Sequence, residues 1–215
     1  MAKEQTLTRI LSIFVIAGSW FLESATSLHA FPLSHGRAAF TSVVEAAKAP
    51  SGWIDFCRRH SSECDAKPGA AGNIELTEDT WNVLVGVNQQ VNAQIKQKTD
   101  FKHWGVSEKW DYPNDGYGDC EDLALLKRKF LMEKGWPREA LWLTVVWTKQ
   151  NQGHTVLLVH TNKGDFVLDS LSSKVVLWSK TGYDFVKRQS HSDPNSWVYI
   201  DGKSGSQDVA VTAKR

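Results

Sequence analysis

The stretch that decides the fold reads GYGDCED at residues 116–122 and continues as LALLKRK at residues 123–129. The glycines and the aspartate predict a loop, and the leucines that follow at helical spacing predict a helix. Cys120 therefore stands where a glycine-rich loop becomes a helix. The partial positive charge of a helix N-terminus favours a thiolate, so this position suits a reactive cysteine.

Two later residues complete a pattern that is typical of thiol chemistry. His154 opens the apolar segment GHTVLLV at residues 153–159, and Asp169 follows the apolar residues FVL at 166–168. A thiol nucleophile needs a nearby base, and an acidic group orients that base. Cys120, His154 and Asp169 are therefore the candidate catalytic residues. Taken singly, each also fits a structural role: a buried thiol, a strand histidine and an aspartate that starts a turn.

The N-terminal segment has the pattern of a secretory signal peptide. Lys3 and Arg9 precede an apolar run from Ile10 to Leu22, and small and polar residues follow up to Ala30. The run is shorter than the roughly 20 residues that a membrane-spanning helix needs. We predict a signal peptide at 1–30, one domain at 31–201 and a polar tail at 202–215. The mature protein would be periplasmic or secreted, with no membrane span; an uncleaved N-terminal anchor is the alternative.

Charge and cysteine content narrow the function further. The 215-residue chain has a formal net charge of +1, and removing residues 1–30 leaves it unchanged because two basic and two acidic residues go with them. This balance, without a basic cluster, gives no sign of nucleic acid binding. Of the three cysteines, Cys57 and Cys64 are close enough in sequence to pair in an oxidising compartment, which leaves Cys120 free. The alternative is a reduced pair, or a metal site with His60.

The order of the elements predicts the α+β class, with N-terminal helices packed on a C-terminal antiparallel sheet. Thr77 is a suitable N-cap for a helix to about Lys98, and a second helix runs from Asp119 or Cys120 to Lys134. An irregular loop is expected at 99–118. Apolar runs predict five strands after the second helix, at 141–148, 154–161, 165–171, 175–178 and 196–201, and an earlier apolar stretch within 36–48 suggests a strand there.

The hairpin between the second and third of those strands governs whether His154 meets Asp169. A two-residue turn at Thr161-Asn162 would set the two directly opposite each other. A turn at Lys163-Gly164 would separate them by about four residues, roughly 13 Å along the strand. Both registers place them on one face of the sheet, and the sequence does not choose between them.

The acidic residues beside Cys120 oppose a thiolate, because negative charge raises the pKa of a thiol. A bound divalent cation would reverse that field. Asp119 and Asp122 share a helix face and Glu121 lies beside them, so these three are candidate ligands for Ca²⁺, which takes about 6–8 oxygens. Acidic residues are also common in the first turn of any helix. A zinc site with Cys120 and His154 fits less well, because structural zinc sites usually show closely spaced Cys or His pairs.

Three motifs together resemble the bacterial transglutaminase-like cysteine peptidases, the LapG-like periplasmic cysteine proteases. They are GDCED at 118–122, GHTVL at 153–157 and VLD at 167–169, and WIDFC at 53–57 with Cys64 is similar to the shorter exported branch. The resemblance implies a papain- or transglutaminase-like fold, a Cys-His-Asp triad at the three candidate positions, and calcium bound by Asp119, Glu121 and Asp122. Thr155 and Ser170 depart from the usual pattern, in which alanine and asparagine stand there.

These observations lead to an exported, calcium-dependent cysteine peptidase that cleaves an envelope or surface protein. The resemblance suggests a surface adhesin as substrate and a membrane-bound regulator as a further partner. Two alternatives remain. The same thioester chemistry could pass the acyl group to an amine and crosslink proteins, or the chain could be a non-catalytic, calcium-regulated binding module. Trp104, Trp110 and Trp147 would either wall a peptide groove or belong to the core.

Overall fold

The computed structural model describes residues 39–65 and 74–201, which all belong to one unit, Leu33–Arg215. The predicted signal peptide at 1–30 and the predicted tail at 202–215 lie outside the described residues. None of the described helices is long and apolar enough to span a membrane.

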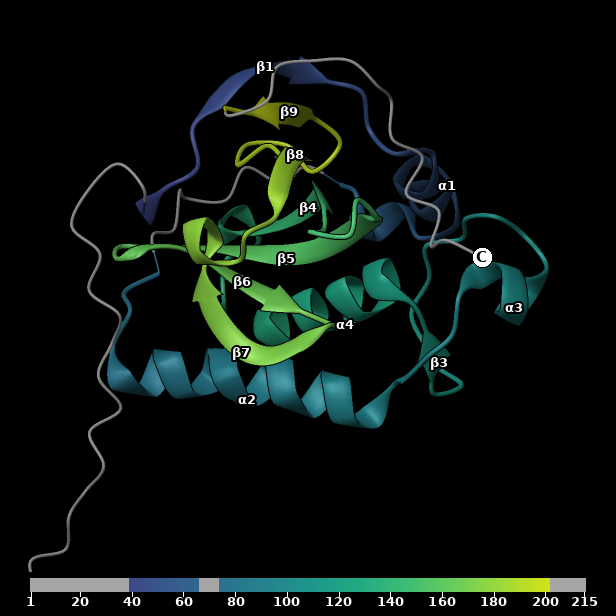
Figure 1. The fold of residues 1–215 in the computed structure, drawn as a ribbon, viewed down its shortest axis with the longest axis horizontal. Coiled ribbons are helices and arrows are strands. Elements are labelled where there is room, and N and C mark those ends of the chain that lie inside the picture. Colours follow the sequence, from purple (N-terminus) through teal and green to yellow (C-terminus); the bar gives the residue numbers. More distant parts are fainter. Residues whose placement is uncertain (1–38, 66–73, 202–215) are drawn as a thin grey trace, which may run out of the picture. The chain divides into compact units, whose positions relative to one another are not determined.

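An antiparallel sheet of seven strands forms the centre of the described structure, in the order β1-β9-β8-β4-β5-β6-β7 (Figure 1). A separate parallel pair, β2 and β3, lies beside the helices. The strands are β1 (Val43–Ala47), β2 (Lys96–Gln97), β3 (Tyr117–Gly118), β4 (Leu141–Trp147), β5 (Gly153–Thr161), β6 (Gly164–Asp169), β7 (Ser172–Leu177), β8 (Asp184–Gln189) and β9 (Trp197–Ile200).

Two long helices cover the β5–β7 part of the sheet. Helix α4 packs against β5, and α2 packs against both α4 and β7. Figure 1 shows α2 below β7, with α4 between α2 and the sheet. The α-helices are α1 (Ser51–Arg59), α2 (Glu78–Gln94), α3 (Asp100–Trp104) and α4 (Cys120–Glu133); short 3₁₀ helices lie at η2 (Ser61–Glu63), η3 (Arg138–Ala140) and η4 (Trp178–Lys180).

The predicted α+β class is confirmed, and so are the starts of the two long helices. Thr77 caps α2: its hydroxyl accepts a hydrogen bond from the Thr80 amide, and the reciprocal bond of a capping box is present. At the other end, α4 stops before Gly135, whose φ of 85° suits glycine. The predicted end of α2 is too late, because the chain turns extended at Ile95 and Lys96–Gln97 pairs with β3.

Two further expectations needed correction. The segment 99–118 is not irregular throughout, since it contains α3 and β3. Strand β8 was not predicted, although it lies in the middle of the sheet between β4 and β9. Its sequence, DFVKRQ, carries three charged residues, so it lacks the apolar run by which the other strands were found.

One cluster of the core uses residues from five strands: Trp142, Val146, Val156, Leu158, Val167, Phe185 and Ile200. Buried residues of α2 and α4, such as Leu84 and Leu123, belong to the core as well. The tryptophans proposed for a peptide groove do not act together. Trp110 is fully buried, with its ring 6.2 Å from that of Trp53 and 6.3 Å from that of Trp197, whereas Trp104 is 45% exposed. Trp110 therefore belongs to the core.

A disulfide joins Cys57 to Cys64, as predicted. It links the last turn of α1 to the residue that follows η2. The alternative metal site of Cys57, Cys64 and His60 is therefore not formed. The two cysteines are bonded to each other, and His60 pairs with Asp111 at 3.1 Å. Cys120 is left as the free cysteine of a chain that has three.

Candidate active site

Cys120 is the first residue of α4, and the local chain is built closely around it. A Cβ on Gly118 would lie 2.8 Å from Cβ of Asp122, so only glycine lets β3 pass so near the first turn of the helix. Asp119 occupies the N-cap position, yet its carboxylate does not cap the helix. One of its oxygens instead accepts a hydrogen bond from the Asp100 amide at 3.1 Å. The side chain of the N-cap residue Asp119 thus bonds to the backbone of α3 and not to that of its own helix.

The Cys120 thiol is buried and makes two contacts. Its Sγ donates to Oε2 of Glu121 at 3.0 Å and accepts from the Thr155 amide, 3.4 Å away on β5. Burial raises the pKa of this thiol well above its usual value, and the charges of Glu121 and Asp119 raise it further. The conflict expected from the sequence is therefore present in the structure: the acidic residues around Cys120 oppose a thiolate.

His154 and Asp169 meet, although neither register considered from the sequence is the observed one. Thr161 pairs with Gly164 across a two-residue turn at Asn162-Lys163, which lies midway between the two alternatives. Asp169 is consequently offset by about two residues from the position opposite His154 and lies on the same face. The paired ladder ends at Leu157, beyond which Nε2 of His154 reaches Oδ1 of Asp169 at 2.7 Å.

Other groups hold the Asp169 carboxylate in place. Oδ1 also accepts from the Leu171 amide at 2.9 Å, and Oδ2 accepts from the Tyr183 hydroxyl at 2.7 Å. Burial raises the pKa of Asp169, but the bond to His154, the charge of His154 and these two donors together lower it below the usual value. The buried Lys127 also interacts with Asp169, although burial lowers the pKa of this lysine to about 7. Asp169 is thus kept ionised beside the imidazole.

A Tyr183→Phe variant tests this support. We expect the loss of the hydroxyl to lower the free energy of unfolding by about 1 kcal/mol at pH 7, because a charge-assisted hydrogen bond is lost. Since the folded pKa of Asp169 is lowered, the effect should be full above the unfolded pKa of about 3.9 and should shrink as pH falls through the folded value. Urea unfolding at several pH values measures it.

Tyr199→Phe is the matched control for that experiment, since Tyr199 is half-buried on β9, which is separated from β5 and β6 by β8 and β4. It should change stability little at any pH. An equal loss in both variants, or a loss for Tyr183→Phe that stays constant down to pH 3, would contradict the role given to the Tyr183 hydroxyl.

One cleft of about 280 Å³ brings Cys120 and His154 together at its wall. A cleft of similar volume, about 290 Å³, lies elsewhere between Met132, Trp142 and His191 and contains none of the three candidate residues. The other described histidines have partners or positions of their own: His103 is bound to Asp115, His160 to Asp165 and His60 to Asp111, and His191 lines the second cleft. His35 lies outside the described residues.

Three buried carboxylates form a group that could hold a cation. They are Asp100, Asp119 and Glu121, each offering an oxygen within 4.8 Å of the others. Asp122, which the sequence suggested as a ligand, is not part of this group and accepts a hydrogen bond from the Asp111 amide at 2.7 Å. Asp100 was not predicted. Asp100 is the first residue of α3, directly after the N-cap Thr99. Aspartate is favourable in the first turn of any helix, so its position in the sequence did not indicate a metal ligand.

The chemistry of this group fits a divalent cation. Oδ1 of Asp100 and Oδ1 of Asp119 are buried without a hydrogen-bond partner among the described residues. Burial, with repulsion from Asp119, raises the pKa of Asp100 to about 6 and that of Asp122 to about 9. Burial raises the pKa of the neighbouring Glu108 to about 7. Crowded, desolvated carboxylates of this kind are stabilised by a hard cation such as Ca²⁺.

A free cysteine at a helix N-terminus and a histidine–aspartate pair on adjacent strands together define the class: this is a cysteine peptidase of transglutaminase-like fold. The chain belongs to the bacterial transglutaminase-like cysteine proteinases (BTLCP), whose family model matches residues 43–205.

Solved structures of LapG from Legionella pneumophila are similar to this chain. The calcium-bound form is 27% identical with a TM-score of 0.49, covering 61% of this chain and 74% of that one. A second structure is 33% identical with a TM-score of 0.45, covering 51% and 63%. An EGTA-treated form is 30% identical with a TM-score of 0.46, covering 55% and 66%. No curated protein matches.

Proposed function

We propose that the protein is an exported peptidase that uses Cys120, His154 and Asp169 as its catalytic triad and depends on a divalent cation, most simply Ca²⁺. The observation that carries the proposal is the 2.7 Å bond from His154 to Asp169 beside a free cysteine in the same cleft. The apolar N-terminal run and the Cys57–Cys64 disulfide support export to the periplasm or medium. A protein of the envelope or cell surface, such as an adhesin, is the proposed substrate.

The chemical steps follow from the positions of the side chains. Asp169 holds Nε2 of His154, so Nδ1 is the ring nitrogen left to take the proton of Cys120. The thiolate attacks the peptide carbonyl, and the Cys120 amide at the start of α4 donates to the developing oxyanion. Collapse breaks the C–N bond, His154 protonates the departing amine, and a thioester remains. Water, deprotonated by His154, hydrolyses the thioester and releases Cys120.

The residues that would hold the cation are Asp100, Asp119 and Glu121. A divalent cation there would supply positive charge that offsets the carboxylates opposing the Cys120 thiolate. Glu121 also accepts the thiol hydrogen bond, so the same carboxylate connects the cation group to the nucleophile.

The reactivity of Cys120 tests this proposal without any knowledge of the substrate. We expect iodoacetamide to alkylate Cys120 with an apparent pKa below the 8.5 of a free thiol when calcium is present, and with a higher value in chelator. The rate is followed across pH by mass spectrometry. The disulfide protects Cys57 and Cys64, so the signal comes from one thiol.

His154→Ala is the companion variant, and it should slow alkylation at neutral pH because the base is lost. Labelling of the wild-type protein no faster than a free thiol, and unaffected by chelator, would favour the non-catalytic binding module instead.

A further inference from the structure

Two lysines stand at the wall of the catalytic cleft. Its lining contains Lys98, Lys102, Asp119 and His154. Asp119 is only 6% exposed and belongs to the cation group, whereas Lys102 is exposed and Lys98 is partly so. The charge that a ligand meets on entering the cleft is therefore positive.

The backbone fixes these lysines close to the nucleophile. The Lys98 amide donates to the Gly118 carbonyl at 2.9 Å, which ties Lys98 to the residue two positions before Cys120. Lys102 lies in the first turn of α3, where its amide donates to Oγ1 of the N-cap Thr99 at 3.4 Å. Both positions are thus part of the frame that positions Cys120, rather than of a loose surface loop.

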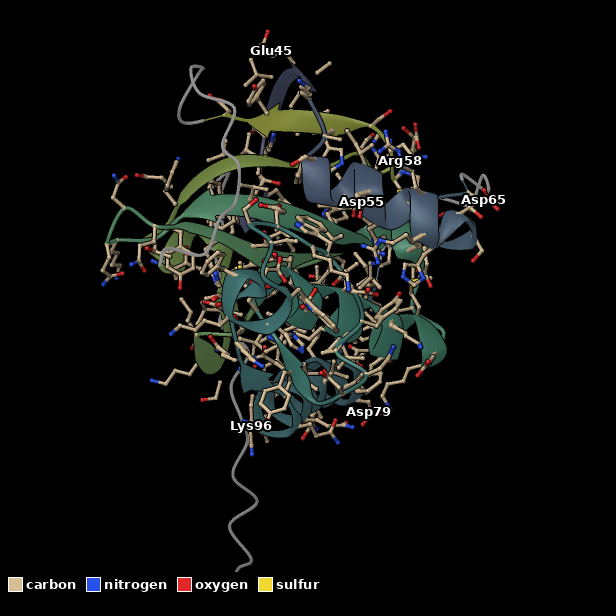
Figure 2. The ribbon with its side chains drawn as sticks, turned by 90° about the vertical axis from the view of Figure 1, so that its right-hand side faces the viewer. Glu45, Asp55, Arg58, Asp65, Asp79 and Lys96 are labelled. Carbon is tan, nitrogen blue, oxygen red and sulfur yellow. A yellow bond between two sulfur atoms is a disulfide. The ribbon has the colours of Figure 1, made fainter. Side chains whose placement is uncertain are left out.

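Neither ammonium group forms an ion pair within the described part of the protein. No described carboxylate lies within ion-pairing distance of Lys98 or Lys102, and the Lys98 Nζ instead lies 5.0 Å from the centre of the Tyr117 ring. The exposed acid of this region, Asp115, is bound to His103 at 2.8 Å. Lys96 also faces Tyr117, and Figure 2 shows it far from Asp55 of α1. The lysines are free to bind an external anion.

The apolar surroundings indicate that the anion belongs to a polypeptide. Leu171 lines the cleft and is 58% exposed, and Phe101, Trp104 and Tyr117 of the adjoining α3–β3 segment are 62%, 45% and 38% exposed. Large apolar side chains interleaved with lysines suit a chain that presents both apolar and acidic side chains. A small inorganic anion would gain nothing from them.

We propose that Lys98 and Lys102 bind acidic side chains next to the scissile bond, so that this peptidase prefers substrate segments containing Asp or Glu. The inference rests on the proposed peptidase function and specifies its substrate class. Positive charge at a cleft also attracts acidic chains over a distance set by the Debye length, about 10 Å at 0.1 M salt. The preference is therefore salt-dependent.

The test begins with a proteome-derived peptide library digested by the full chain in calcium, with cleavage sites located by mass spectrometry. One cleaved peptide is then resynthesised with Glu, Gln or Lys at each position flanking the scissile bond. For the wild-type protein we expect kcat/KM to favour Glu over Lys by about tenfold at one or more positions, and the ratio to fall towards one at high salt. The double variant Lys98→Glu/Lys102→Glu should reverse the preference.

Lys163→Glu is the matched control, because Lys163 is an exposed lysine in the β5–β6 turn, at the opposite end of β5 from His154. It makes the same change in net charge and should keep the wild-type preference. The neutral double variant Lys98→Gln/Lys102→Gln should bring the Glu to Lys ratio close to one.

The outcomes separate this inference from the peptidase proposal. Cleavage that depends on Cys120 but shows no Glu preference, or a preference that survives charge reversal, would overturn the role of the lysines and leave the peptidase intact. Binding of the protein to phosphatidylglycerol vesicles through these lysines, without a Glu preference, would assign the surface to a membrane instead. Absence of any cleavage in calcium would overturn both proposals.

Discussion

Replacing Cys120 by alanine should lower kcat/KM for peptide hydrolysis by about 10⁴-fold or more while leaving the protein folded. Loss of the nucleophile removes the covalent step, so that only the oxyanion donor and substrate binding still assist the attack of water. The alanine fits the site, because Cys120 is a small side chain at the wall of a cleft, and its removal costs only the hydrogen bonds to Glu121 and from the Thr155 amide. We therefore expect the melting temperature to change by only a few degrees.

Cleavage of the peptide identified from the library, followed by chromatography, measures this effect. The Cys120→Ser variant provides a second reading, because it keeps a hydrogen-bond donor to Glu121 and lacks a good nucleophile. Asp169→Asn combined with Cys120→Ala should be no slower than Cys120→Ala alone, since triad residues act as a unit. Cleavage near the wild-type rate by folded Cys120→Ala would show that another residue carries the reaction.

Much of the fold could be read from local sequence, because the signals were local. The cap at Thr77, the stop at Gly135 and the apolar runs of β4, β5 and β6 each depend on a few neighbouring residues. The same is true of Cys120 at the start of α4, which follows from a glycine-rich loop meeting a leucine-rich helix. Short-range rules govern such features, so a single sequence is enough to predict them.

The features that escaped the sequence depend on residues far apart in the chain. Asp100 joins Asp119 and Glu121 only because β2 pairs with β3, which carries α3 to the beginning of α4. The His154–Asp169 contact depends on where a two-residue turn falls in the segment TNKGD, at residues 161–165, where several placements were compatible with the residue types. Strand β8 lies inside the sheet because it pairs with both β4 and β9. Its own charged sequence does not indicate that pairing.

Calcium should raise the melting temperature, and chelation should lower it. Binding to the folded state alone contributes about 2.7 kcal/mol when the free ligand is at one hundred times its Kd, which for a domain of this size corresponds to roughly 5–10 °C. The two unpartnered oxygens of Asp100 and Asp119 would gain ligand bonds that the protein does not otherwise provide. Differential scanning calorimetry in calcium and in chelator measures the shift.

The difference should widen as pH rises. Without a cation, the raised pKa values of Asp100, Glu108 and Asp122, about 6, 7 and 9, mean that the folded state holds protons that the unfolded state releases near pH 4. The contribution of these three groups to stability in chelator is therefore full below about pH 4 and is lost as pH rises through these values. A cation competes with those protons and compensates the charge, so its stabilising effect should be larger at pH 8 than at pH 5.

Variants of individual carboxylates decide which residues hold the ion. Asp100→Asn should weaken calcium binding by about tenfold or more, because it removes the negative charge of one of the three grouped ligands. The same variant should raise the melting temperature in chelator, since one repelling carboxylate is gone. Asp122→Asn should weaken binding by no more than about threefold, because the amide oxygen can still accept the Asp111 hydrogen bond and only a neighbouring charge is lost.

Glu133→Gln, an exposed change at the far end of α4, should leave calcium affinity and the melting temperature unaltered in isothermal titration and scanning calorimetry. A larger loss of calcium affinity for Asp122→Asn than for Asp100→Asn would return the ion to Asp119, Glu121 and Asp122, the ligands suggested by the sequence. A larger loss of calcium affinity for Asp100→Asn, together with a higher melting temperature of this variant in chelator, requires the ion to link α3 to α4. Calcium would then hold the segment carrying Lys102 against the start of the catalytic helix, so that one ion supports both the nucleophile and the proposed substrate-binding lysine.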